Sequence, residues 1–306
     1  MEQISSDIHF ILLSKNRTLQ AYSCIRSLLD MADDLTEGDI SVVYADSPGI
    51  PYGPLIDKLR CRFIRQTHFY QNIVDAVSHA GKPFIGFIVD DVIYRDSFLA
   101  GHIARLLKEN TSLDSFSLRL GRHITDTIDP EFEPIEDNVF TYKTQAGLGR
   151  TWNYFWELDS SIYRANHVLD YLKRCRADEI TFPNPLESVY YKHMPNFMAG
   201  RAAGPRGLPS RVRYLFWKMA TPMSMVKKVA FFEHSKAVNQ GVNLVADIGI
   251  PRKEYISPLK LHALFLKGYY IDPSPLHDIQ NQSPHLGPKY FRLINDKGEI
   301  YPLSFE

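Results

Sequence analysis

The sequence has few cysteines and no excess of charge of either sign. Its 306 residues include three cysteines (Cys24, Cys61 and Cys175), and Lys plus Arg equals Asp plus Glu at 35 each. Cysteines so far apart fit neither a zinc-site spacing nor a disulfide framework, which predicts a reducing compartment. Because a balanced charge creates no overall field that selects nucleic acid, no nucleic-acid partner is expected.

Long hydrophobic runs and several common motifs are also missing. No stretch reaches about 18 apolar residues, so no transmembrane helix is predicted. The first residues lack a signal-peptide pattern, and the expected location is therefore the cytoplasm. No GxGxxG follows the first apolar run, and GxxxxGK[ST], GxSxG and HExxH do not occur. These absences argue against a dinucleotide-binding Rossmann site, a P-loop and an esterase elbow.

Charge is unevenly distributed along the chain. No Asp or Glu lies between Ser188 and Phe232, whereas aromatic, methionine and cationic residues are frequent there. One interpretation is a solvated loop, and the other is a cationic face for pyrophosphate or for the anionic inner surface of a membrane. The cations are Lys192, Arg201, Arg206, Arg211, Arg213, Lys218, Lys227 and Lys228.

The first 120 residues alternate between strand and helix patterns. Apolar runs predict strands at 8–13, 40–45, 62–64, 84–89 and 115–120, and helical spacing predicts helices after Asn16, over 68–80 and over 98–108. This alternation predicts an α/β fold with a mainly parallel sheet flanked by helices. Asn16 is expected to cap the first helix. The rest of the chain is less regular.

The most informative segment is 84–94, in which two carboxylates follow a near-continuous apolar run. Such a run is typical of a strand buried on both faces. Asp90 and Asp91 then come together, and adjacent carboxylates are unfavourable in apolar surroundings unless a positive group meets them. A divalent cation at the carboxyl end of the strand would meet them, since α/β sheets bind ligands there. The alternative is a turn or a helix cap, where aspartate is common.

A second dense segment, 152–164, combines aromatic residues with carboxylates. Rings stack on the apolar faces of sugars, and carboxylates accept hydrogen bonds from hydroxyl groups. The segment therefore predicts a sugar-binding surface that includes Trp152, Trp156, Glu157 and Asp159. The alternative is an aromatic core with acids at the surface.

Residues 11–29, 42–47 and 89–91 together resemble conserved features of GT-A-fold glycosyltransferases. They resemble the opening strand with its Asn-Arg turn, the second strand ending in aspartate, and the metal-binding aspartate motif. The likeness is greatest to the family-2-like bacterial enzymes that build surface polysaccharides. It covers roughly residues 8–120 well and the rest loosely. Thr18 stands where the family often has proline, and Asp90 and Asp91 are adjacent rather than separated by one residue.

The resemblance implies a metal-dependent glycosyltransferase, with inversion favoured, that uses Mn²⁺ or Mg²⁺. It would move a sugar from a nucleotide-diphosphate donor to a surface glycan or lipid-linked glycan. Residues 1–125 would bind the nucleotide sugar, and 126–306 would form the acceptor-side half and a C-terminal extension of the same domain. The implied donor contacts are Ser14, Asn16, Arg17, Asp46, Asp90 and Lys236, and the acceptor contacts are Trp152, Trp156 and Glu157.

The resemblance also assigns a base and a metal site. Glu187 lies at about the distance beyond the aspartates where inverting relatives place a catalytic acid, and Asp159 is the second candidate for the base. Glu187 has the alternative of only stabilising a helix start. Asp90 and Asp91 would bind the metal with His234, since relatives often supply a late histidine; His285 is a weaker rival.

Two other functions are compatible with this fold. A non-catalytic glycan- or nucleotide-binding protein would keep the fold and lack turnover. A nucleotidyltransferase is disfavoured because the Gly-rich loop with Arg and Lys that such enzymes carry after the first strand is absent.

Overall fold

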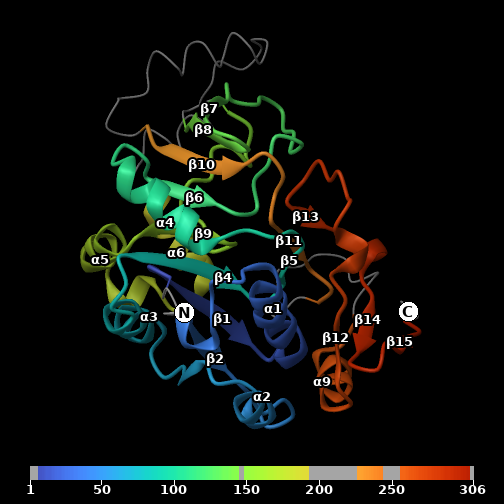
Figure 1. The fold of residues 1–306 in the computed structure, drawn as a ribbon. Helices are drawn as coiled ribbons and strands as arrows, with labels where there is room; N and C mark the ends of the chain where they lie inside the picture. Colours follow the sequence, from blue (N-terminus) through green and yellow to red (C-terminus); the bar gives the residue numbers. More distant parts are fainter. Residues whose placement is uncertain (1–5, 145–147, 193–225, 244–255, 304–306) are drawn as a thin grey trace, which may run out of the picture.

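A nine-stranded sheet runs through the molecule in the order β3-β2-β1-β4-β9-β6-β10-β8-β7 (Figure 1). The computed structural model describes residues 6–144, 148–192, 226–243 and 256–303. Four strands at one end are parallel, namely β1 (Ile8–Lys15), β2 (Ile40–Ala45), β3 (Arg62–Arg65) and β4 (Phe84–Val89). Beyond them, β9 (Ser161–Arg164) lies antiparallel between β4 and β6 (Ser115–Ser117).

The other end of the sheet is mixed. β10 (Lys228–Phe232) is parallel to β6 and antiparallel to β8 (Val139–Lys143), and β7 (Glu133–Glu136) forms the edge. The expected α/β fold is confirmed, with parallel order in β1–β4 and in the β6–β10 pair. Two small sheets complete the fold: β5 (Val92–Tyr94), β11 (Ala237–Gln240) and β13 (His285–Leu286); and β12 (Tyr269–Ile271), β14 (Leu293–Asn295) and β15 (Ile300–Tyr301).

Helices cover both faces of the sheet and create two hydrophobic cores. Alternate residues of β1 serve the two cores, since Phe10 and Leu12 join one and Ile11 and Leu13 join the other. This double burial explains the near-continuous apolar runs of the parallel strands. The first core takes residues from α1 (Thr18–Met31), α2 (Gly53–Lys58), α4 (Ala100–Glu109) and α9 (Pro258–Leu266), and the second from α3 (Phe69–His79), α5 (Ala165–Arg174) and α6 (Pro183–Lys192).

Gly86 of β4 leaves room for the ring of Phe10, its partner on the neighbouring strand β1. A Cβ atom at this position would lie 2.5 Å from Cδ1 of Phe10. A side chain there would therefore push the Phe10 ring out of the core.

Most predicted elements agree well with the structure; the departures are the start of α1 and the end of β6, which stops at Ser117 instead of residue 120. The bounds of β2 and β4 match their apolar runs, and α3 and α4 begin and end within one or two residues of the prediction. The prediction that Asn16 caps α1 is wrong. Arg17 is the N-cap residue, no side chain caps the helix, and Asn16 has a φ of 54°. Asparagine tolerates this left-handed conformation, so the residue forms a turn instead.

Most of the cationic segment 188–232 lies outside the described residues, including Arg201, Arg206, Arg211, Arg213 and Lys218. The side chains of two of its lysines are described, and both pair with acids. Lys227 Nζ is 3.1 Å from Asp114 Oδ1, and Lys228 Nζ is 3.7 Å from Glu133 Oε2. Within the described ranges, no helix is long and apolar enough to cross a bilayer.

Candidate functional site

Asp90 is buried at the carboxyl end of β4, where the parallel strands end. Only 3% of it is exposed. Its carboxylate accepts a 2.7 Å hydrogen bond from Ser14 Oγ, at the end of β1, and pairs with the Arg17 guanidinium at 2.7 Å. Ser14 Oγ is also 2.6 Å from Tyr52 Oη. Burial raises the pKa of Asp90 and Arg17 opposes the rise, so an arginine from α1 meets the charge that the sequence left unexplained.

Asp91 is the more exposed of the two aspartates and also lies close to Arg17. Its side chain is 23% exposed, with Oδ2 3.7 Å from Arg17 Nη1 and Oδ1 3.3 Å from Asn239 Nδ2. Asn239 is buried, and its Oδ1 has no hydrogen-bond partner among the described residues. No cluster of three or more His, Cys, Asp or Glu side chains suited to a metal occurs in the described part of the chain. One carboxylate and an amide oxygen still fit a hard cation that takes its remaining ligands from diphosphate and water.

The structure does not bring His234 or Lys236 to the aspartates. His234 stacks on His123, with ring centroids 5.9 Å apart. Lys236 Nζ is 2.5 Å from Asp96 Oδ2. Both side chains line a separate cavity of about 400 Å³, together with residues such as His102. Their proposed metal and donor roles are therefore not supported by position.

His285 lies closer to the aspartates than the sequence suggested. Strand β13 pairs with β11 so that His285 is opposite Asn239, and Asn239 is opposite Val92 of β5. Desolvation lowers the pKa of His285, although the residue as a whole is exposed, while Asp159 and Asp91 both oppose this change. His285 is therefore within electrostatic reach of the end of β4 and of the start of β9.

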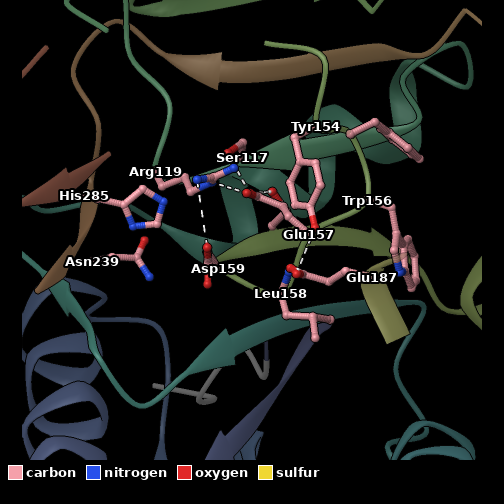
Figure 2. Close-up of polar contacts among 12 residues, drawn as sticks. Ser117, Arg119, Tyr154, Trp156, Glu157, Leu158, Asp159, Glu187, Asn239 and His285 are labelled. Carbon is pink, nitrogen blue, oxygen red and sulfur yellow. Dashed lines mark hydrogen bonds and ion pairs between the residues drawn. The ribbon is translucent and has the colours of Figure 1, made fainter. Parts of the chain in front are cut away.

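A second carboxylate centre lies at the start of β9 (Figure 2). Glu157 and Arg119 are 1% and 4% exposed and form an ion pair. Arg119 Nη1 is also 3.9 Å from Asp159 Oδ2, whose side chain is 20% exposed. Burial raises the pKa of Glu157 to about 8 although Arg119 lowers it. Sequence reasoning missed Arg119, which it placed inside the predicted strand 115–120; β6 ends at Ser117.

Glu187 holds the turn that presents Asp159. Its Oε1 accepts a 2.8 Å hydrogen bond from the Leu158 N–H, and its Oε2 accepts a 2.9 Å bond from the Tyr154 hydroxyl. Figure 2 shows Asp159 apart from these bonds, on the side of Arg119 and His285. Burial and the nearby Asp159 raise the pKa of Glu187 to about 7. The Asp159 carboxylate thus disfavours ionisation of Glu187.

Ser160, next to Asp159, has a strained backbone. Its φ of 77° is rare for a residue other than glycine. Its hydroxyl is 2.7 Å from Tyr94 Oη, and its N–H donates a 2.8 Å bond to the carbonyl of Phe87. Strain that is held by several bonds is frequent at functional sites, and here it fixes the carboxylate that precedes it.

The predicted acceptor contacts of Trp152, Trp156 and Glu157 are wrong, because all three side chains are buried. The Trp152 indole N–H donates to Asp129, and the Trp156 indole N–H donates to the carbonyl of Leu186. Rings enclosed in the core cannot stack on a sugar. The alternative interpretation, an aromatic core, is the one that the structure supports.

Two predicted donor contacts lie near the end of β2. Asp46 follows β2 and pairs with the exposed Arg65 at 2.9 Å. The Asn16 N–H donates a 3.0 Å bond to the carbonyl of Ala45, and the Asn16 Oδ1 is buried without a partner among the described residues. The Asp46 carboxylate and the Asn16 Oδ1 atom therefore lie at the carboxyl end of β2, where a ligand would meet them.

The raised pKa of Glu187 predicts an unusual pH dependence of the free energy of unfolding. Because its pKa rises from 4.5 to about 7 on folding, the native state binds the extra proton in that window. We therefore expect the free energy of unfolding to fall as pH rises from about 4.5 to about 7. Urea unfolding at several pH values should show a smaller decline in Glu187→Gln than in the wild-type protein. An equal decline in both would show that Glu187 is not the group responsible.

Comparison with known proteins gives a partial likeness to a glycosyltransferase. No family model matches the chain. It is 24% identical over 186 residues to the bifunctional glycosyltransferase pgtA of Dictyostelium discoideum, covering 53% of this chain and 24% of the relative. The chain therefore spans about a quarter of the length of this curated relative.

Two solved structures show a weak similarity to the chain. S. aureus TarS 1–349 in complex with UDP is 15% identical, with a TM-score of 0.40 over 75% of this chain and 59% of that one. A cytidylyltransferase from Leptospira borgpetersenii is 11% identical, with a TM-score of 0.39 over 63% and 73%. At these scores the likenesses do not decide between sugar transfer and nucleotidyl transfer.

Proposed function

We propose that the chain is a metal-dependent glycosyltransferase that moves a sugar from a nucleotide diphosphate to a hydroxyl acceptor. The observation that carries the proposal is the pair of carboxylate centres at one edge of the sheet. Asp90 and Asp91 form the first with Arg17, and Asp159 and Glu187 form the second. His285 interacts electrostatically with Asp91 and Asp159. Such an arrangement suits two substrates that react between the centres.

The donor centre is suited to a diphosphate. Asp91 and Asn239 would hold Mn²⁺ or Mg²⁺, and the bound ion would neutralise charge on the leaving diphosphate. Asp90 accepts hydrogen bonds from Ser14 and Arg17, so we assign it the positioning of Arg17 rather than metal binding. Asn16 and Asp46, near the end of β2, would contact the nucleoside.

The acceptor centre is suited to proton transfer. We assign Asp159 as the base that takes the acceptor proton while the hydroxyl oxygen attacks the anomeric carbon and the diphosphate leaves. This direct displacement would invert the configuration at that carbon. Both oxygens of Glu187 already accept hydrogen bonds, so Glu187 is a positioning residue for the 157–160 turn.

The two proposed halves of the chain, 1–125 and 126–306, do not each contain one complete centre. The proposed donor half, 1–125, supplies Asp90 and Asp91, and the acceptor-side half, 126–306, supplies Asp159 and Glu187. Arg119 and Asn239 cross this division. A surface or lipid-linked glycan as acceptor rests on the family resemblance alone.

The Mn²⁺-dependent affinity for a nucleoside diphosphate tests the proposed role of Asp91 as a metal ligand. In Asp91→Asn we expect Mn²⁺-dependent affinity for a nucleoside diphosphate to fall at least about tenfold, because a charged metal ligand is lost. Calorimetry with UDP and GDP, with and without Mn²⁺, measures the effect. Asp137→Asn, an exposed carboxylate at the separate cavity, is the matched control. Unchanged Mn²⁺-dependent binding in Asp91→Asn would place the metal elsewhere.

An assay of turnover distinguishes an enzyme from a non-catalytic binding protein. With a panel of nucleotide sugars and Mn²⁺, we expect slow release of nucleoside diphosphate by hydrolysis and faster release with an acceptor. A nucleotide sugar that binds tightly without hydrolysis or transfer would favour the non-catalytic alternative.

A further inference from the structure

Helix α9 presents a regular stripe of exposed residues that no part of the proposed reaction uses. Leu259 and Leu266 are 58% and 56% exposed, which is unusual for leucine. They are seven residues apart and therefore lie on the same face of the helix. The complete exposed set on this face is Leu259, Lys260, Ala263, Leu266 and Lys267.

The opposite face of α9 is fixed against α1, so the stripe cannot turn inward. His262 Nδ1 is 2.7 Å from Thr18 Oγ1, and the Phe265 ring lies against Tyr22 with centroids 5.6 Å apart. Figure 1 shows α9 at the periphery of the molecule, at the bottom of the view and away from β6 and β10. The stripe is thus held outward on a rigid element.

An uncharged loop extends the apolar part of this surface. Pro48, Gly49 and Pro51 are exposed in the loop that precedes α2. A Cβ atom at Gly49 would lie 3.0 Å from Leu259 Cδ2, so this loop touches the stripe. The apolar surface therefore continues from α9 onto the loop.

The charge of the stripe identifies its partner. Its charged members are Lys260 and Lys267, and no Asp or Glu occurs between Ile256 and Ile271. A second copy packed across a two-fold axis would bring these lysines together without acids on the helix, which is unfavourable. Leucines beside lysines on one helical face suit an anionic lipid surface, where apolar side chains enter the interface and lysines meet the headgroups.

We propose that α9 is a membrane-contact helix whose stripe lies on the surface of an anionic bilayer. The contact is peripheral, and it is weak and reversible because two leucines and two lysines form a small anchor. It is independent of the proposed glycosyl transfer, and it involves a different surface from the cationic segment 188–232.

Co-sedimentation of the full chain with vesicles tests the proposal. We expect binding to phosphatidylcholine vesicles that contain phosphatidylglycerol, and little binding to phosphatidylcholine alone. The double variant Leu259→Asp with Leu266→Asp and the double variant Lys260→Glu with Lys267→Glu should each bind at least about tenfold more weakly. Added salt should weaken wild-type binding, because the lysines act through charge.

Matched changes elsewhere on the surface provide the controls. Leu99→Asp replaces a leucine that is 53% exposed before α4, and Lys173→Glu with Arg174→Glu reverses two exposed cations on α5. Both controls should bind like the wild-type protein. The proposal is overturned if the wild-type protein ignores anionic vesicles, or if α9 variants bind like the controls. It is also overturned if light scattering shows a dimer that Leu259→Asp converts to a monomer, since the stripe then belongs to a second copy.

Discussion

The Arg119→Ala variant is expected to lose about 3–5 kcal/mol of its free energy of unfolding. Arg119 forms an ion pair with Glu157, and both residues are almost fully buried. Removing the arginine leaves the Glu157 carboxylate in the core without its cation, and it also removes a positive group close to Asp159. Urea or guanidinium unfolding at pH 9, above the pKa of about 8 of Glu157, measures the change by circular dichroism.

Two further variants separate the buried pair from other causes of instability. Arg119→Met combined with Glu157→Leu removes both charges and should recover most of the loss, because buried ion pairs contribute little over apolar residues of similar size. Arg105→Ala removes an arginine that is 48% exposed and pairs with Glu109 and Glu136, and it should cost far less, because exposed ion pairs contribute little to stability. A loss for Arg119→Ala no larger than for Arg105→Ala would contradict the buried ion pair.

The parallel half of the sheet was predictable because its strands carry their signal locally. The run 84–89 is buried on both faces and is followed directly by Asp90 and Asp91, so strand and site appear together in the sequence. Alternation of strands with amphipathic helices then fixes an α/β architecture. No long-range contact is needed for this inference.

The partners of these residues could not be read from the sequence, because the fold alone brings them together. Arg17 meets Asp90 across 73 positions, and Asn239 meets Asp91 across 148. From the sequence, His234 is the first candidate for the metal site and His285 the weaker one. Only the pairing of β13 with β11 places His285, rather than His234, beside Asn239.

The aromatic segment 152–164 shows a different limit. Aromatic residues next to acids have the composition of both a sugar site and a folded core. Trp152 and Trp156 each donate their indole N–H within the protein, which allows full burial. Composition therefore identified the segment that carries the candidate site, and burial decided which of its side chains face solvent. Asp159 and Glu187 are the candidates that remain there.

The second large effect is expected for Asp159→Asn, which should lower kcat by at least about 10² while leaving donor affinity unchanged. Asparagine keeps the size of the side chain and cannot accept the acceptor proton. Asp159 is partly exposed, and its Oδ2 lies 3.9 Å from Arg119 Nη1. Steady-state kinetics with saturating nucleotide sugar measure the change, and calorimetry confirms that the donor still binds.

Two substitutions at Glu187 distinguish the catalytic base from the residue that positions it. Glu187→Gln keeps an oxygen for the Leu158 N–H and should reduce kcat by about tenfold or less. Glu187→Ala leaves the Leu158 N–H and the Tyr154 hydroxyl without this partner and should reduce kcat more strongly, because the turn before Asp159 loosens. If Glu187→Gln instead falls as far as Asp159→Asn, Glu187 is the base, and its pKa of about 7 then becomes the acidic limb of the pH–rate profile. If both amide variants retain near-normal turnover, neither carboxylate takes the proton.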